Sequence, residues 1–402
     1  MNDADVRKIH SALDDFKIEL PSWGFAQTGT RFGKFIQDAA ASTTEDKFHD
    51  AGLVHKLTGA CPSVAVHVLW DFQPGEDPKE VARLAEKHGV KIGAINPNVF
   101  QDQSYKLGSF CSPDPEARKA AMEHTLWSVE IGAAVGSDIL SMWLADGTNY
   151  PGQDSMLRRK RDLDNAFRRI AEVMREKWPE ATMLVEYKPF EPGFYHTDIA
   201  DWGMAHAFAR HAGSNAKVLV DTGHHLPATN IEHIVAFLLD EGMLGGFHFN
   251  DRKYADDDLT MGSIDPYGAF RIFDQIAQYE FETGEKTDIA YMVDQSHNLK
   301  PKIEAMVQTV MEAQKYVAKA QLVDREALAE AQKAGDIVGA ETQLKKAYET
   351  DVTGVLAEWR KNKGLAPDPL EELRTSGALE ELGKQRKAER EARGEVATSS
   401  YA

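Results

Sequence analysis

The chain has 402 residues, of which 42% are hydrophobic and 27% charged, so it is long enough for one large α/β domain with an extension. Its formal net charge of −18 argues against nucleic acid or an anionic membrane as a partner, because both attract basic patches. Two cysteines are too few for a disulfide framework, and no apolar signal region or membrane-spanning run is found, so we expect a cytoplasmic enzyme.

Short apolar segments alternate with helical patterns along the first 300 residues. Residues 1–20 predict an amphipathic helix, and eight later segments are short, rich in β-branched or aromatic residues and bounded by turn-forming residues, which is typical of strands. The predicted strands are residues 23–27, 63–70, 91–98, 139–146, 182–188, 216–223, 245–251 and 289–295. Between them lie helical patterns at 77–89, 114–136, 156–178 and 230–242. The pattern at 114–136 begins with Asp114 and Pro115 and ends at Gly136, as a helix should.

Eight strands alternating with helices predict a closed (β/α)8 TIM barrel. An open doubly wound sheet is the alternative, and it is weakened because no Gly-rich turn follows an early strand. The strand pattern stops near residue 300. We therefore expect a catalytic barrel with an N-terminal helix at 1–300 and a helical C-terminal extension at 301–402, which wraps the barrel or contacts a neighbouring subunit.

Polar side chains stand at the strand ends where a parallel barrel collects its functional residues. His67 and Asp71 follow the second strand, Trp143 ends the fourth, and Lys188 ends the fifth. The four late strands each deliver one oxygen or imidazole ligand, namely Glu186, Asp221, His248 and Asp294. Three carboxylates and an imidazole suit a hard or borderline divalent cation such as Mn²⁺, so the sequence predicts a metal held by these four residues.

A second group of ligand-type residues shares Asp221. His224 follows three residues later, and Asp256 and Asp258 stand two apart, so in extended backbone both would point the same way while Asp257 points away. Together these residues predict a second cation site. Five carboxylates would then face two divalent cations, with Lys188 to neutralise the remaining charge.

Four segments resemble the metal-site motifs of L-rhamnose isomerases of broad aldose–ketose specificity, within the xylose-isomerase-like barrels. They are VEYKPFEP, VDTGHH, HFNDRKYADDDL and MVDQSHN, in the right order. The resemblance implies a structural metal on Glu186, Asp221, His248 and Asp294 and a catalytic metal on Asp221, His224, Asp256 and Asp258. Xylose isomerases carry a carboxylate at the position of His248, so this chain sides with the rhamnose branch.

The same resemblance implies roles around the sugar. His67, oriented by Asp71, would lie near the ring oxygen, and Trp143 would shield the reacting carbons from water. Lys188 would bind a substrate oxygen, and Phe32 would reach into a neighbour's pocket. Taken alone, each feature has a simpler structural explanation. His67 could be a core histidine and Trp143 a packed core residue, while Lys188 could be a surface lysine and ADDDL a solvated acidic turn. Convergence on one rim favours the functional interpretation.

These observations predict an isomerase that converts L-rhamnose to L-rhamnulose by a metal-assisted 1,2-hydride shift, with a water near Asp256 or Asp258 moving the proton. A cis-enediol route with a protein base is the mechanistic alternative. We expect two divalent ions per subunit, Mn²⁺ first and Co²⁺, Mg²⁺ or Zn²⁺ otherwise, and by resemblance a homotetramer. Rival hypotheses are a single-metal ketose 3-epimerase, a phosphoester hydrolase with clustered metals, and a non-enzymatic metal-stabilised barrel.

Overall fold

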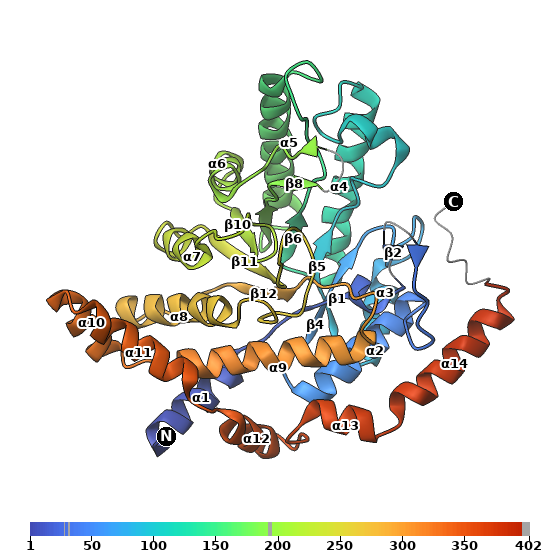
Figure 1. Cartoon of the computed structure of the whole chain (residues 1–402). Helices are drawn as coiled ribbons and strands as arrows, with labels where there is room; N and C mark the ends of the chain where they lie inside the picture. The colour runs from blue at the N-terminus through green and yellow to red at the C-terminus, as the bar shows by residue number, and fades with distance from the viewer. Residues whose placement is uncertain (28, 31–32, 192–194, 396–402) are drawn as a thin grey trace.

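A parallel sheet of eight strands forms the centre of the molecule (Figure 1). The computed structural model describes residues 1–27, 29–30, 33–191 and 195–395. In sheet order the strands are β1 (Leu20–Pro21), β4 (Ser63–His67), β5 (Lys91–Asn96), β6 (Ile139–Met142), β7 (Thr182–Glu186), β10 (Ala216–Asp221), β11 (Leu244–Phe249) and β12 (Ala290–Val293). Glu19 joins the two ends of the sheet, since its N–H donates to Tyr291 O at 2.8 Å and its carbonyl accepts from Val293 N at 2.9 Å. The predicted (β/α)8 barrel is confirmed.

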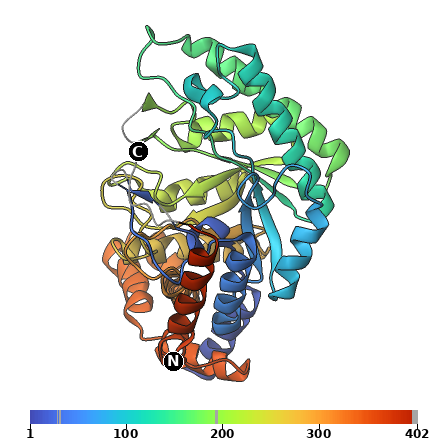
Figure 2. The same cartoon turned by 90° about the vertical axis from the view of Figure 1, so that its right-hand side faces the viewer.

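Helices surround the sheet (Figures 1 and 2). They are α1 (Asp3–Asp15), α2 (Thr44–Thr58), α3 (Pro78–Lys87), α4 (Pro115–Val135), α5 (Met156–Lys177), α6 (Trp202–Ala212), α7 (Ile231–Asp240), α8 (Pro266–Thr283) and α9 (Lys302–Ala320). Local chemistry sets their limits. In α4, the side chain of Asp114 accepts from Glu116 N at 2.9 Å, and Gly136 ends the helix at φ 72°. Two short hairpins, β2 (Gly29–Thr30) with β3 (Gly33–Lys34) and β8 (Phe190–Glu191) with β9 (Tyr195–His196), lie outside the barrel sheet.

Helix α9 packs on the barrel of its own chain. Ile303, Met306, Val307 and Val310 are buried, and the helix contacts α1, α2 and α8. The apolar face of α9 is therefore covered by its own chain, which is one of the two arrangements expected for the extension. Five further helices follow along the lower edge of Figure 1: α10 (Arg325–Ala334), α11 (Ile337–Glu349), α12 (Thr353–Asn362), α13 (Pro369–Thr375) and α14 (Ala378–Ala392). The division of the chain at residue 300 stays a prediction.

The barrel interior is layered. A small apolar cluster fills one level and includes Ala65, Ala94, Leu184, Leu219 and Met292. Because side chains on a strand alternate, the residue two positions later on each strand faces the same interior one level higher. Those residues are His67, Asn96, Glu186, Asp221 and Asp294. The polar level thus rests on a packed apolar floor, at the strand ends where function collects.

Two predicted elements differ from the structure. The predicted strand at 23–27 is wrong, because β1 ends at Pro21, which lacks an N–H for the ladder, and Ser22–Phe25 forms a 3-10 turn (η1). The N-terminal helix ends at Asp15 rather than at residue 20, since Phe16, Ile18 and Leu20 instead alternate into the core. Within the described part of the chain, no helix is both long and apolar enough to cross a membrane.

Candidate metal centre

The four residues expected to hold the first metal lie together. Glu186, Asp221, His248 and Asp294 offer ligand atoms that all lie within 4.8 Å of one another. The Nδ1 atom of His248 is 3.3 Å from Glu186 Oε1, 3.7 Å from Asp294 Oδ2 and 3.9 Å from Asp221 Oδ2. Each residue lies in one of the last two positions of a different strand or directly after it, and the rigid ladder fixes their separation. The donor set, three carboxylates and one imidazole, fits a divalent cation.

Electrostatics within this group indicate a site built around positive charge. Burial lowers the pKa of His248, but Glu186, Asp294 and Asp221 outweigh it and raise that pKa to about 9. Burial, reinforced by nearby carboxylates, raises the pKa of Asp221 to about 7. A cation that binds here replaces the imidazole proton and relieves the repulsion between the carboxylates, so protons and metal compete.

The second predicted group adjoins the first. His224 Nε2 lies 3.3 Å from Asp256 Oδ1 and 3.9 Å from Asp221 Oδ2, and His224 Nδ1 lies 3.1 Å from the carbonyl of Tyr187. Burial and then Asp256 raise the pKa of Asp258 well above its usual range, as expected for adjacent carboxylates. Asp256 Oδ2 is 2.7 Å from Lys188 Nζ. Lys188 thus neutralises one carboxylate of this group.

The acidic segment at 251–258 divides its aspartates between two tasks. Asp251 closes the neck of the loop through paired backbone bonds with Leu259 at 2.8 and 2.9 Å, and Asp257 accepts from the backbone of Lys253 and Tyr254. Asp256 and Asp258 instead line the cavity at the barrel mouth. We expected extended backbone to point both carboxylates the same way. That expectation is wrong, because the backbone of Asp258 is left-handed, at φ 48°. A tight loop aims both carboxylates inward.

The cavity beside the metal ligands has a volume of about 240 Å³ and an aromatic wall. Lys188 supplies the one lysine or arginine charge among the described residues that line it. The aromatic lining residues are Trp23, Trp70, Phe100 and Trp143, and the polar ones outside the two ligand groups are His67, Asn96, Ser141, Lys188 and Glu191. Trp23 Nε1 donates to the ligand Asp294 at 2.9 Å. The wall is therefore tied to the first ligand group.

His67 belongs to this wall, and Asp71 lies behind it. The His67 ring is 4.8 Å from the Trp23 ring and 4.1 Å from the Trp70 ring, and burial lowers its pKa to about 3. Asp71 accepts from the backbone N–H of His67 at 3.1 Å rather than from the ring, whose Nδ1 has no hydrogen-bond partner among the described residues. Asp71 thus positions the backbone of His67 rather than its ring.

Lys47 on α2 completes the support behind the wall. Its ammonium lies 2.6 Å from Asp71, and Ser22, which precedes Trp23, also donates to Asp71 at 2.6 Å. Both members of the ion pair are buried. A Lys47→Met variant leaves a buried carboxylate unpaired, and we expect a loss of about 3–5 kcal/mol in the free energy of unfolding, measured by urea denaturation.

The control for that variant is Lys87→Met. Lys87 forms an equally short ion pair with Glu45, at 2.6 Å, but on the surface. An exposed pair contributes about 0–1 kcal/mol, so this control should unfold near the wild-type urea concentration. Equal losses in the two variants would contradict a supporting role for the buried pair.

Comparison with known proteins identifies the family. A profile described as "Xylose isomerase-like TIM barrel" matches residues 63–282, more than half of the chain. The chain belongs to this xylose isomerase-like TIM barrel family. It is 38% identical over 388 residues to a protein named probable sugar isomerase from Mesorhizobium japonicum, covering 95% of this chain and 89% of that protein. Another protein of that name, from Rhizobium meliloti, is 38% identical over 392 residues, covering 96% of this chain and 89% of the relative.

Solved structures agree on the fold of the xylose isomerase-like barrel. A D-allulose 3-epimerase from Methylomonas sp. superposes with a TM-score of 0.55 at 14% identity, covering 75% of this chain and 98% of that chain. At this identity the likeness concerns the fold alone.

A further sequence relative is more distant. The xylose isomerase of Thermus thermophilus is 26% identical over 259 residues, covering 60% of this chain and 66% of that protein.

Sequence reasoning missed several residues of this candidate site. Asn96 and Ser141 line the cavity, and strand alternation places each two residues after an apolar position in the barrel, Ala94 and Ile139. That alternation was a usable signal. Trp23, Trp70 and Phe100 lie on turns or loops, and Glu191 lies in the two-residue strand β8, so no period indicates their orientation. Phe32, expected to reach a neighbour's pocket, lies outside the described residues.

Proposed function

We propose that this barrel is a divalent-metal-dependent aldose–ketose isomerase whose substrate is L-rhamnose and whose product is L-rhamnulose. The proposal is carried by the convergence of Glu186, Asp221, His248 and Asp294 within 4.8 Å, beside a cavity with an aromatic wall. Two relatives matched over nearly the whole chain are named probable sugar isomerases, which supports sugar isomerisation. The motif resemblance to L-rhamnose isomerases supports the choice of sugar.

Two residues are assigned to handling the sugar itself. His67 is held neutral by burial, so its imidazole can accept a hydrogen bond from the anomeric hydroxyl and assist ring opening. Burial opposes the charge of Lys188, but Asp256 and Glu191 raise the pKa of that lysine, and the ammonium stays available to a substrate oxygen. Lys188 lies 5.4 Å over the Trp143 ring, which excludes water from the same side.

The metal would be held by the two ligand groups, Glu186, Asp221, His248 and Asp294 in the first and Asp221, His224, Asp256 and Asp258 in the second. Bound divalent cations would supply Lewis-acid polarisation of the substrate carbonyl. The isomerisation moves a hydride from C2 to C1 of the sugar and a proton from O2 to O1, so it needs no external oxidant. We assign to the Asp256 and Asp258 carboxylates the task of holding the water that would carry this proton.

A single-metal ketose 3-epimerase is the second candidate, and one observation favours it. Of the two predicted ligand groups, only the first has all its ligand atoms within 4.8 Å of one another, whereas Asp256 of the second group pairs with Lys188. An epimerase would bind one cation per chain and invert C3 of a ketose. Cation stoichiometry therefore separates the two candidates.

The test uses chelated full-length protein reloaded in turn with Mn²⁺, Co²⁺, Mg²⁺ and Zn²⁺. Each form is given L-rhamnose, other aldohexoses and aldopentoses in deuterated water, and ketose formation and deuterium at C1 are followed by NMR. We expect ketose from L-rhamnose, fastest with Mn²⁺, with little deuterium at C1 because a hydride shift does not exchange with solvent. Extensive deuterium incorporation at C1 would support the cis-enediol route. Epimerisation of ketoses without turnover of aldoses would contradict the proposed isomerase.

We also propose that the chain assembles as a homotetramer in the cytoplasm. Large apolar side chains on loops at the barrel mouth support self-association, since Leu226, Tyr254 and Leu299 are 55%, 77% and 85% exposed. Light scattering at micromolar concentration measures the assembly directly. A monomer would contradict the proposed tetramer.

A further inference from the structure

Arg252 connects the two loops that carry the second ligand group. One loop follows β10 and carries His224, and the other follows β11 and carries Asp256 and Asp258. Arg252 stands at the start of the second loop, directly after its neck at Asp251. Its side chain reaches back to the first loop, so one residue spans both.

The guanidinium of Arg252 binds backbone alone on the first loop. Nε donates to the carbonyl of His225, Nη1 to that of Thr222 at 3.1 Å, and Nη2 to that of Leu226 at 2.8 Å. These three carbonyls bracket His224 in sequence. Because the planar fork of an arginine fixes the directions of its donors, the three bonds together fix the path of the turn.

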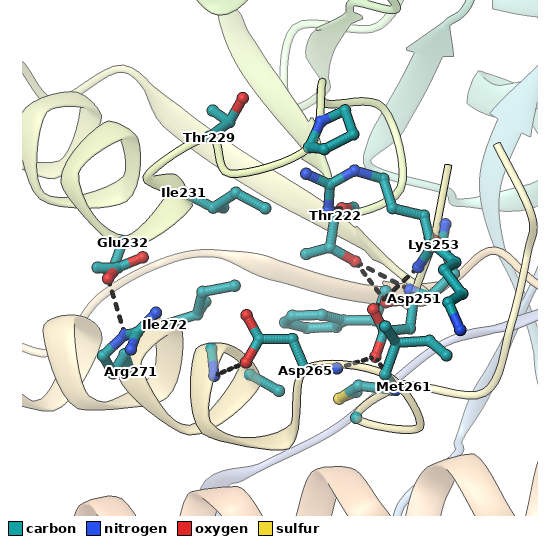
Figure 3. Close-up of a pocket in the computed structure, with 18 of the residues that line it drawn as sticks. Thr222, Thr229, Ile231, Glu232, Asp251, Lys253, Met261, Asp265, Arg271 and Ile272 are labelled. Carbon is teal, nitrogen blue, oxygen red and sulfur yellow. Dashed lines mark hydrogen bonds and ion pairs between the residues drawn. The ribbon is translucent and has the colours of Figure 1, made fainter. Parts of the chain in front are cut away.

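The backbone of Arg252 is anchored, through the side chain of Asp251, to the segment just before α8. Its N–H donates to Asp251 Oδ1 at 2.9 Å, and Asp251 Oδ2 accepts from Ile264 N and Asp265 N at 2.8 and 2.9 Å, where α8 begins. Thr222, Asp251 and Asp265 lie around one cavity of about 240 Å³ (Figure 3). Arg252 therefore ties the turn that carries His224 to the start of α8.

The first ligand group has a different support. Glu186, Asp221 and His248 end or lie within strands of the barrel ladder, where Asp221 pairs with His248 in register. Asp294 follows β12 and accepts from Trp23. Asp221 also meets the turn after β10, since its Oδ1 accepts from Gly223 N at 2.6 Å and from His224 N at 3.2 Å, but Arg252 binds no atom of Glu186, His248 or Asp294. A change at Arg252 should therefore act mainly on the second group.

We infer that Arg252 is a positioning residue for the second cation site, where its guanidinium sets the separation between His224 and the Asp256–Asp258 pair. This inference rests on the proposed two-cation isomerase. Residues that orient metal ligands typically change affinity by about 10–100-fold when replaced. We expect that loss at one of two sites only.

The test is calorimetric titration of Mn²⁺ into chelated full-length protein. Asp258→Asn identifies the binding class that belongs to the second group. Arg252→Lys keeps the positive charge but lacks the fork, and Arg252→Met removes both. Both variants should weaken the class identified by Asp258→Asn by about 10–100-fold and change the other class much less, through Asp221 alone.

The matched control is Arg271→Met. Arg271 lines the same cavity but pairs with Glu232, at 2.7 Å between Nε and Oε1, away from either ligand loop (Figure 3). It should bind both cations as the wild type does. The inference is overturned if Arg252→Lys keeps wild-type affinity in both classes or weakens the two classes equally. A stoichiometry of one cation per chain in the wild type would instead reject the two-cation function itself, and the inference with it.

Discussion

Asp221→Asn is expected to abolish isomerisation and to weaken both cations. Asp221 is fully buried at the end of β10, and its Oδ2 lies 3.9 Å from an imidazole of each ligand group, His224 Nε2 and His248 Nδ1. Its oxygens also accept from Asn250 Nδ2 at 3.0 and 3.1 Å, which holds the carboxylate in place. Asparagine keeps the shape but removes the charge that both cations share. We expect kcat/KM to fall by about 1,000-fold or more, roughly 4 kcal/mol of transition-state stabilisation.

Two further variants bracket this result. Asp294→Asn should weaken the first cation only, and Asp258→Asn the second only, because each residue belongs to one ligand group. Calorimetry on all three proteins, with circular dichroism to verify folding, separates the shared ligand from the unshared ones. Asp221→Asn protein that binds both cations with wild-type affinity would contradict the shared assignment.

The barrel and its late strand ends could be predicted from the sequence because both depend on short-range periodicity. Glu186, Asp221, His248 and Asp294 each end or follow an apolar run, and parallel strands bring such ends to one rim. The fold prediction therefore also located the ligands. The predicted strands extended too far at their C-terminal ends, since β4, β5 and β6 end at residues 67, 96 and 142.

The remaining parts of the site depend on contacts between distant segments. Ser22 and Lys47 meet at Asp71 from a 3-10 turn and from α2, and no spacing in the sequence indicates that meeting. Arg252 looks like one more charge in an acidic segment, yet its guanidinium is taken up by three carbonyls. Asp251 and Asp257 could not be assigned from the sequence either, because composition alone does not separate carboxylates that stabilise a loop from those that the loop presents to the cavity.

Removal of the cations should lower the melting temperature, and the loss should grow as pH rises. A cation that binds the folded state alone, at about 100 times its dissociation constant, adds about 2.7 kcal/mol, so two sites should shift the melting temperature by about 5 °C or more. In the metal-free protein the raised pKa of His248, about 9, stabilises the fold at low pH, and this contribution is lost as pH rises through that value. Asp221, with a pKa raised to about 7, loses its proton over the same range and adds repulsion.

Melting curves from about pH 6 to about pH 8.5, with and without Mn²⁺, measure this dependence. The metal-free protein should lose stability across the range, while the loaded protein changes less, because the cations take the place of the proton on His248. His248→Gln is the control, since glutamine does not titrate and its metal-free form should show a flatter pH dependence. If the metal-free and metal-loaded wild type melted at the same temperature at every pH, that result would contradict the claim that charge repulsion among Glu186, Asp221 and Asp294 destabilises the metal-free protein. A gap that narrows toward high pH would contradict it equally, because proton competition acts in the opposite direction.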